Sequence, residues 1–337
     1  MNTKKNKTID LFAGIGGIRI GFEKAGFETV FSNDFDPWCK ETYDLNFNNV
    51  PLTVADIAKV KSSSLPDFDL LLGGFPCQPF SIAGYRRGFL DTGRGDLFFE
   101  IIRIIRDKKP SVVFLENVKN LKSHDRGKTF KIISEALDDL GYHVKSAVLN
   151  SAQFGNVPQN RERIYIVGFK AKKHHDAFEF PAPVSLNKSV ADILEAGVDE
   201  KYYYHDHPLH KQLKKAMTTP GAVYQWRRVY VRENKSGVSP TLTANMGTGG
   251  HNVPLIRDRK GIRKFTPREC ARLQGFPDSY KLPRTLSDPK LYKQIGNSVS
   301  VPVIERVARQ IRKALEINGH VFRESIESPS QFVRATA

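Results

Sequence analysis

Residues 8–34 read TIDLFAGIGGIRIGFEKAGFETVFSND, and this stretch predicts the first unit of the fold. An apolar strand over residues 8–12 is followed by a glycine-rich turn. A helix should follow, because Ile18, Gly21, Phe22 and Ala25 recur at helical spacing. Gly26 ends that helix, and a second strand over residues 28–33 leads to Asp34. The pattern therefore predicts a βαβ unit with two parallel strands.

The glycine turn and Asp34 together indicate a nucleoside site. Glycines allow a tight bend and let a ligand come close to the backbone. Asp34 lies 20 residues after Gly14, where an acidic side chain can bind both ribose hydroxyls. The turn is Gly-x-Gly-Gly and not the Gly-x-Gly-x-x-Gly dinucleotide fingerprint. A tight turn with only a structural role remains the alternative.

Strands and helices continue to alternate up to about residue 195. This predicts an α/β fold with a doubly wound, mostly parallel sheet. The expected strands are 68–72, 111–115, 142–150 and 164–169, and the expected helices are 37–47, 96–109, 127–140, 266–273 and 298–318. Residues 196–289 have weaker periodicity and predict a smaller, loop-rich, mainly β domain. The first domain should comprise residues 1–195 plus 290–337, with the final helix returning to it.

One cysteine stands out by its position. Cys77 follows the apolar run 68–72 in the turn GGFPCQPFS, which lifts its thiol out of the core. Glu116 ends another expected strand, at the same sheet edge. Arg161 and Arg163 alternate, so both should project from one face of a strand. The sequence offers no convincing histidine partner for Cys77. We therefore expect Cys77 to be a nucleophile in an enzyme that is not a cysteine protease.

Composition narrows the class of partner. Lys and Arg number 52 against 36 Asp and Glu, a net charge of +16, which favours nucleic acid. The sequence has three cysteines, widely spaced, which is typical of a reducing cytosol and argues against disulfides or a cysteine-based zinc site. We expect no metal. There is no long apolar stretch, so we expect no membrane span.

In chain order, these motifs resemble the cytosine-5 DNA methyltransferases, in particular compact bacterial enzymes of the restriction–modification type. The resemblance covers roughly residues 8–315. The matching segments are DLFAGIGG (10–17), Asp34, DI (56–57), GFPCQ (74–78), ENV (116–118), QNRER (159–163), RECARLQGFP (268–277) and QIGNSV (294–299). Taken together these motifs are highly specific, although the glycine turn alone is not.

The resemblance implies catalytic roles for four residues. Cys77 attacks carbon 6 of cytosine, which turns carbon 5 into a nucleophile for the methyl group of S-adenosylmethionine. Glu116 donates a proton or hydrogen bond at ring nitrogen 3, so its pKa should be raised. Arg163 binds the carbonyl oxygen of the base, and Arg161 orients the cysteine and its loop.

The resemblance also implies a binding set for the cofactor, whose product is S-adenosylhomocysteine. Those residues are Phe12, Ala13, Gly14, Gly16, Gly17, Asp34, Phe35, Asp56, Ile57, Pro76, Leu97, Asn297 and Val299. The target carbon is inaccessible in a duplex, so the cytosine must be flipped out. The implied DNA contacts are Ser81, Arg86, Arg87 and Arg94 in the glycine-rich loop 82–95 and its flank, and Gln225, Arg227, Arg228, Thr241 and Leu242 in the small domain.

The expected partner is double-stranded DNA, bound by a monomeric protein in a bacterial cytoplasm at the nucleoid. A cognate endonuclease would share the DNA site. Residues 225–253 faintly resemble the recognition region of relatives that read sites of the CC-(N)-GG kind. Three rivals remain open. An RNA methyltransferase acting on transfer RNA would share the catalytic motifs. A nicotinamide-dependent oxidoreductase would need the missing dinucleotide fingerprint, and an inactive DNA-binding protein would not need Cys77 and Glu116.

The implied mechanism predicts a covalent trap. Duplex DNA carrying 5-fluorocytosine at the target should form a stable adduct through Cys77, because fluorine at carbon 5 cannot leave as a proton does. Peptide mapping by mass spectrometry locates the adduct. Attachment at Cys39 or Cys270 instead would refute the assignment.

Overall fold

The computed structural model describes residues 5–76, 97–227, 229–247 and 254–316. Its main sheet has seven strands in the order β3-β2-β1-β4-β5-β8-β6. These are β3 (Thr53–Val54), β2 (Glu28–Asp34), β1 (Lys7–Leu11), β4 (Leu70–Gly73), β5 (Val112–Val118), β8 (Glu162–Phe169) and β6 (His143–Asn150). β8 runs antiparallel to both neighbours, and the other pairs are parallel. The mostly parallel sheet is confirmed.

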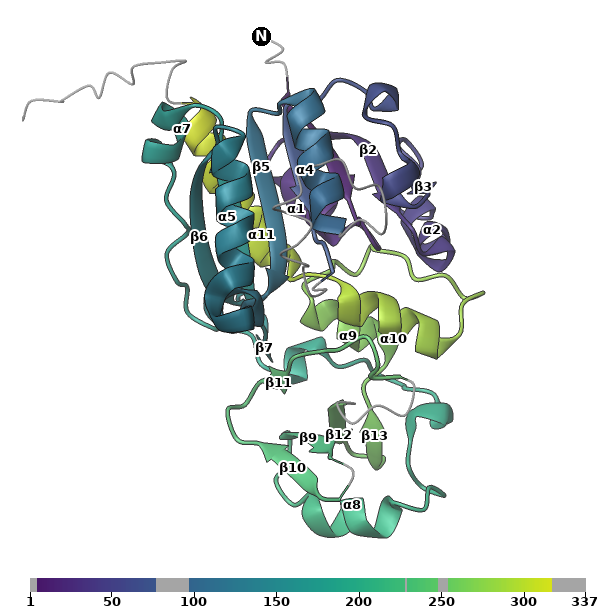
Figure 1. The fold of residues 1–337 in the computed structure, drawn as a ribbon. Coiled ribbons are helices and arrows are strands. Elements are labelled where there is room, and N and C mark those ends of the chain that lie inside the picture. Colours follow the sequence, from purple (N-terminus) through teal and green to yellow (C-terminus); the bar gives the residue numbers. More distant parts are fainter. Residues whose placement is uncertain (1–4, 77–96, 228, 248–253, 317–337) are drawn as a thin grey trace, which may run out of the picture.

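Helices cover both faces of this sheet (Figure 1). α4 (Leu97–Lys108) and α5 (Lys128–Asp139) pack on one face through Ile101 and Ile133. α1 (Gly17–Lys24) and α11 (Val301–Glu316) pack on the other face. α1 and α11 also contact each other, so the return of the final helix to the first domain is confirmed. Further α-helices of the described residues on this part are α2 (Pro37–Asp44), α6 (Ser151–Gly155) and α7 (Lys172–Ala177).

A second, antiparallel sheet lies apart from the first (Figure 1). Its order is β10-β9-β12-β13, formed by β10 (Val231–Asn234), β9 (Val223–Trp226), β12 (Pro254–Arg257) and β13 (Ile262–Lys264). α8 (His210–Ala216) packs against it through Leu213. Short strands joined by loops are what the sequence predicted for this region.

α9 (Pro267–Leu273) and α10 (Asp288–Asn297) lie between the two sheets (Figure 1). The start of α9 is fixed by a reciprocal cap, in which Thr266 and Glu269 bond each other's backbone N–H groups. One core cluster joins Ala13 of the first turn to Leu242, Phe265 and Tyr292. Residues of both expected domains therefore share a core, and the exact domain boundaries remain a prediction.

The boundaries of several elements differ from expectation by a few residues. The final helix begins at Val301 rather than at residue 298, because Ser298–Ser300 form a connection after α10. α2 ends at Asp44 rather than at residue 47. Arg161 lies between the short strand β7 (Gln159–Asn160) and β8, so only Arg163 of the arginine pair belongs to β8.

The strand order creates a switch point between β1 and β4. From β1 the chain winds outward to β2 and β3, and from β4 it winds the other way to β5. Loops that leave the carboxyl ends of β1 and β4 separate there, which leaves a crevice at that edge of the sheet. Gly73 ends β4, and Phe12 follows β1 with a φ of 58°. The fold thus places the glycine turn and the segment before Cys77 side by side.

Candidate active site

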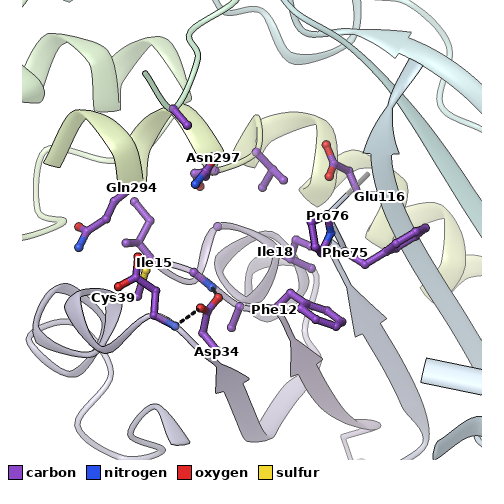
Figure 2. A pocket seen from close by; sticks show the side chains of 18 of the residues that line it. Phe12, Ile15, Ile18, Asp34, Cys39, Phe75, Pro76, Glu116, Gln294 and Asn297 are labelled. Carbon is purple, nitrogen blue, oxygen red and sulfur yellow. Dashed lines mark hydrogen bonds between the residues drawn. The ribbon is translucent and has the colours of Figure 1, made fainter. Parts of the chain in front are cut away.

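A cavity of about 760 Å³ opens at this edge (Figure 2). It is lined by residues that follow β1, end β2, follow β4 and end β5, together with residues of α10 and of the segment after β11 (Ser239–Pro240). This volume lies in the range of small-molecule and cofactor sites. Segments more than 200 residues apart in the chain therefore build one site.

Most of the predicted cofactor set lines this cavity. The lining members are Phe12, Ala13, Gly14, Gly17, Asp34, Phe35, Asp56, Ile57, Pro76, Leu97, Asn297 and Val299. Gly16 is not among the lining residues. Its φ is 79°, and a Cβ there would lie 2.4 Å from the Phe47 ring, so packing and turn geometry already require glycine at this position.

Asp34 is held in place by the backbone around it. Its carboxylate accepts hydrogen bonds from the N–H groups of Gly14 and Asp36, both at 2.8 Å. Burial raises the pKa of Asp34, and these two hydrogen bonds oppose the rise. A Cβ built on Gly14 would meet no atom within 4 Å, so this side of the turn faces open space in the cavity. Phe35 exposes 75% of its surface at the rim.

Glu116 is the buried acid of the site. Burial raises the pKa of Glu116, as the sequence analysis expected, and the nearby guanidiniums of Arg163 and Arg161 oppose this rise. The Arg163 Nε atom lies 3.2 Å from Glu116 Oε1. That separation is within ion-pair range, but Oε1 accepts no hydrogen bond from the described residues because the two groups are poorly aligned. Glu116 thus stays available to a ligand.

Arg161 is fixed by three carbonyl groups. Its guanidinium donates to the Leu242 carbonyl at 2.9 Å, to the Gly296 carbonyl at 3.3 Å, and to the Ser298 carbonyl. Burial and the charge of Arg163 lower the pKa of Arg161 to about 9. Arg161 and Arg163 both line the cavity, although they do not share one strand.

Asn117 is a positioning residue that the motif contained but the sequence analysis did not assign. Its side-chain amide donates to the Phe75 carbonyl at 2.9 Å. This bond ties the end of β5 to the turn after β4. Pro76, the last described residue of that turn, lines the cavity. Asn117 therefore holds the backbone immediately before Cys77.

Several predicted contacts fall outside the described residues. They are Cys77, Ser81, Arg86, Arg87, Arg94 and Arg228. Among the others, Arg227 is partly exposed just after β9. Thr241 donates its hydroxyl to the Asn160 carbonyl at 2.6 Å.

Gln225 and Leu242 are buried, with 3% and 0% of their surface exposed. Leu242 instead reaches the cavity, because its N–H and C=O groups bond Gln159 and Arg161. Direct DNA contact by these two side chains stays a prediction, and it would require them to leave this packing.

The described residues contain neither a candidate metal site nor a helix that could span a membrane. No group of three or more His, Cys, Asp or Glu side chains there could hold a metal ion. No helix in that part of the chain is long and apolar enough to cross a membrane.

Comparison with known proteins agrees with this geometry. A family model described as C-5 cytosine-specific DNA methylase matches residues 6–313. The chain belongs to this family, and its activity class is therefore that of a cytosine-5 DNA methyltransferase. The match to the family model covers every described element from β1 to α10 and most of α11.

Curated relatives match over nearly their whole length. Type II methyltransferase M.Bsp6I of Bacillus sp. (strain RFL6) is 55% identical over 310 residues, which cover 90% of this chain and 98% of the relative. Type II methyltransferase M.HhaI of Haemophilus parahaemolyticus is 41% identical over 322 residues, which cover 91% and 94%.

Solved structures share the fold at lower identity. A Spodoptera frugiperda DNMT2 mutant has a TM-score of 0.72 at 20% identity, covering 91% of this chain and 100% of that one. The S. pombe Dnmt2 methyltransferase has a TM-score of 0.71 at 21% identity, covering 93% and 99%. These likenesses support the fold alone.

The raised pKa of Glu116 predicts a pH dependence. A carboxyl with a raised pKa is protonated below that pKa and loses its proton as the pH rises through it. If protonated Glu116 is needed, kcat/KM should fall on the alkaline side. Glu116→Gln, which has no such proton to lose, should lower the rate by roughly 10²- to 10⁴-fold and abolish that alkaline limb.

The control is Glu162→Gln. Glu162 begins β8 but pairs with Lys119 at the surface, so its removal should leave the pH profile intact. Methyl-transfer rates measured from acid to alkaline pH decide. An alkaline limb that persists in Glu116→Gln would contradict the role given to this acid.

Proposed function

We propose that this protein transfers a methyl group from S-adenosylmethionine to carbon 5 of a cytosine flipped out of a short, specific site in double-stranded DNA. The observation that carries the proposal is the shared cavity. Asp34, which suits a ribose, and Glu116, a buried acid with a raised pKa, line the same space. A reaction that transfers a group from a nucleoside cofactor to a second ring, which must itself accept a proton, needs both of these residues in one site.

The residues present fit the cofactor. The cavity is large enough, and the open side of Gly14 allows close approach to the backbone. Asp34 would bind the ribose, while Phe12, Ile57 and Leu97 would form the apolar walls for the adenine. When bound, S-adenosylmethionine supplies an electrophilic methyl group on its sulfonium sulfur.

The chain's own residues would activate the base. The Cys77 thiolate forms a bond to carbon 6 of cytosine, and Glu116 gives a proton or hydrogen bond to ring nitrogen 3. Electron density then gathers at carbon 5. After carbon 5 is methylated, a base acting through water takes the proton from carbon 5, the electron pair of that bond forms the double bond between carbons 5 and 6, and the bond from carbon 6 to Cys77 breaks. Glu116 recovers its proton from nitrogen 3.

Two arginines would support these steps in different ways. Arg163, beside Glu116, would bind the carbonyl oxygen of the base and stabilise the charge that develops there. Arg161 is committed to three backbone carbonyls, so it would shape the cavity rather than touch the base.

The resemblance to restriction–modification enzymes also supports a proposal for the DNA site and for the role of its methylation. The methylated site would be a short palindrome, of the CC-(N)-GG kind, and its modification would protect host DNA from a cognate endonuclease that reads the same site. The protein would act as a monomer in the bacterial cytoplasm, at the nucleoid. The net charge of +16 supports contact with DNA phosphates.

Methyl transfer tests this proposal directly. The wild-type protein, given cofactor with a labelled methyl group, should label duplex DNA and leave transfer RNA unlabelled. Cys77→Ser should abolish labelling while cofactor binding, measured by calorimetry, survives, because serine is a far weaker nucleophile.

The matched control is Cys270→Ala. Cys270 is fully buried in α9, away from the cavity lining, so its variant should still label DNA. Labelling of transfer RNA alone, or normal turnover by Cys77→Ser, would overturn the proposal.

A further inference from the structure

The cavity has three parts that differ in chemistry. Phe12, Asp56 and Leu97 line the part assigned to the nucleoside, and Glu116 marks the part assigned to the base. A third part is lined by Ile15, Cys39, Lys293, Gln294 and Asn297. Figure 2 shows Gln294, Cys39 and Ile15 on the opposite side of the cavity from Glu116 and Phe75. Of the residues in this third part, only Asn297 is expected from the sequence to bind the cofactor.

Lys293 gives the third part its positive charge. Among the described residues that line the cavity, the cationic side chains are Arg161, Arg163 and Lys293. Arg161 is committed to backbone carbonyls, and Arg163 lies against Glu116. The Lys293 ammonium has three donors and is 55% exposed, and Asp36 takes one donor at 3.0 Å.

Contacts between α2 and α10 hold Lys293 at the rim. Gln294, the next residue, donates to the Trp38 carbonyl at 2.7 Å and accepts from the Thr42 hydroxyl at 2.7 Å. One turn earlier on α10, the Lys290 ammonium lies 2.8 Å from the centre of the Trp38 ring. The two helices are therefore joined beside the cavity, and the base of the Lys293 side chain is fixed there.

We propose that Lys293 binds the carboxylate at the amino-acid end of the cofactor. This inference rests on the proposed function and deepens it. The nucleoside of the cofactor goes to Asp34 and Asp56, and its methyl group must face the base beside Glu116. The amino-acid end then extends into the third part, where a carboxylate requires a cation or N–H donors. Lys293 supplies the cation, and its pair with Asp36 takes only one of its three donors.

Binding measurements with two ligands test the assignment without measuring turnover. S-adenosylhomocysteine carries the amino-acid end, and 5′-methylthioadenosine lacks it. In calorimetry, Lys293→Met should weaken S-adenosylhomocysteine on the order of tenfold, the effect of losing one charge-assisted contact. The same variant should bind 5′-methylthioadenosine as the wild type does.

Two further variants serve as controls. Lys290→Met removes the ammonium that lies on Trp38, not one that lines the cavity, so it should leave both affinities unchanged. Asp36→Asn removes the competing charge but keeps a side-chain oxygen for the Trp38 N–H, so S-adenosylhomocysteine should bind at least as tightly as before.

The outcomes separate the possibilities. Equal weakening of both ligands in Lys293→Met would mean a distorted cavity and would overturn the assignment. Unchanged binding of S-adenosylhomocysteine would also overturn it. If the wild-type protein bound neither ligand, the proposed cofactor would fail, and this inference with it.

Discussion

The candidate site depends on the hydrogen bonds that the buried guanidinium of Arg161 donates to backbone carbonyls. A charged group away from water is tolerated when its N–H donors are satisfied. The Nη1 and Nη2 groups of Arg161 donate to the carbonyls of Leu242, Gly296 and Ser298, which belong to two segments far from it in the chain, while its Nε has no partner among the described residues. This one side chain therefore connects the end of the main sheet to the segment after β11 and to the end of α10.

The neighbouring contacts make this connection tight. A Cβ on Gly296 would lie 2.3 Å from the Thr243 carbonyl oxygen, so only glycine lets α10 approach the segment after β11 this closely. Gln159, two residues before Arg161, accepts the Leu242 N–H and donates to the Leu273 carbonyl. The segment that leads from the small sheet thus forms part of the cavity wall. The small sheet is therefore connected by this piece of backbone to the cavity that Glu116 lines.

Local patterns in the sequence predicted the main sheet, its helices and most of the cavity. Asp34 and Glu116 could be placed at the cavity because they lie at or near the ends of buried strands, and parallel strands deliver such residues to one edge. Long-range contacts could not be predicted in this way. Neither the position of Leu242 in the cavity wall nor the Lys293–Asp36 pair follows from periodicity, since both depend on how α10 packs against distant segments. The placement of Arg161 before β8 depends on the short β7–β11 pairing, which two residues on each side form.

Hydrogen–deuterium exchange in Arg161→Met tests the central role of this residue most directly. Without the guanidinium, the segments 239–246 and 294–299 should lose their common anchor. Their amides, including those of Leu242 and Ser298, should then exchange faster together, while the amides of β1 and β4 keep their protection. Unchanged exchange in both segments would contradict the account, because it would mean that the small sheet and α10 are joined to the cavity without Arg161.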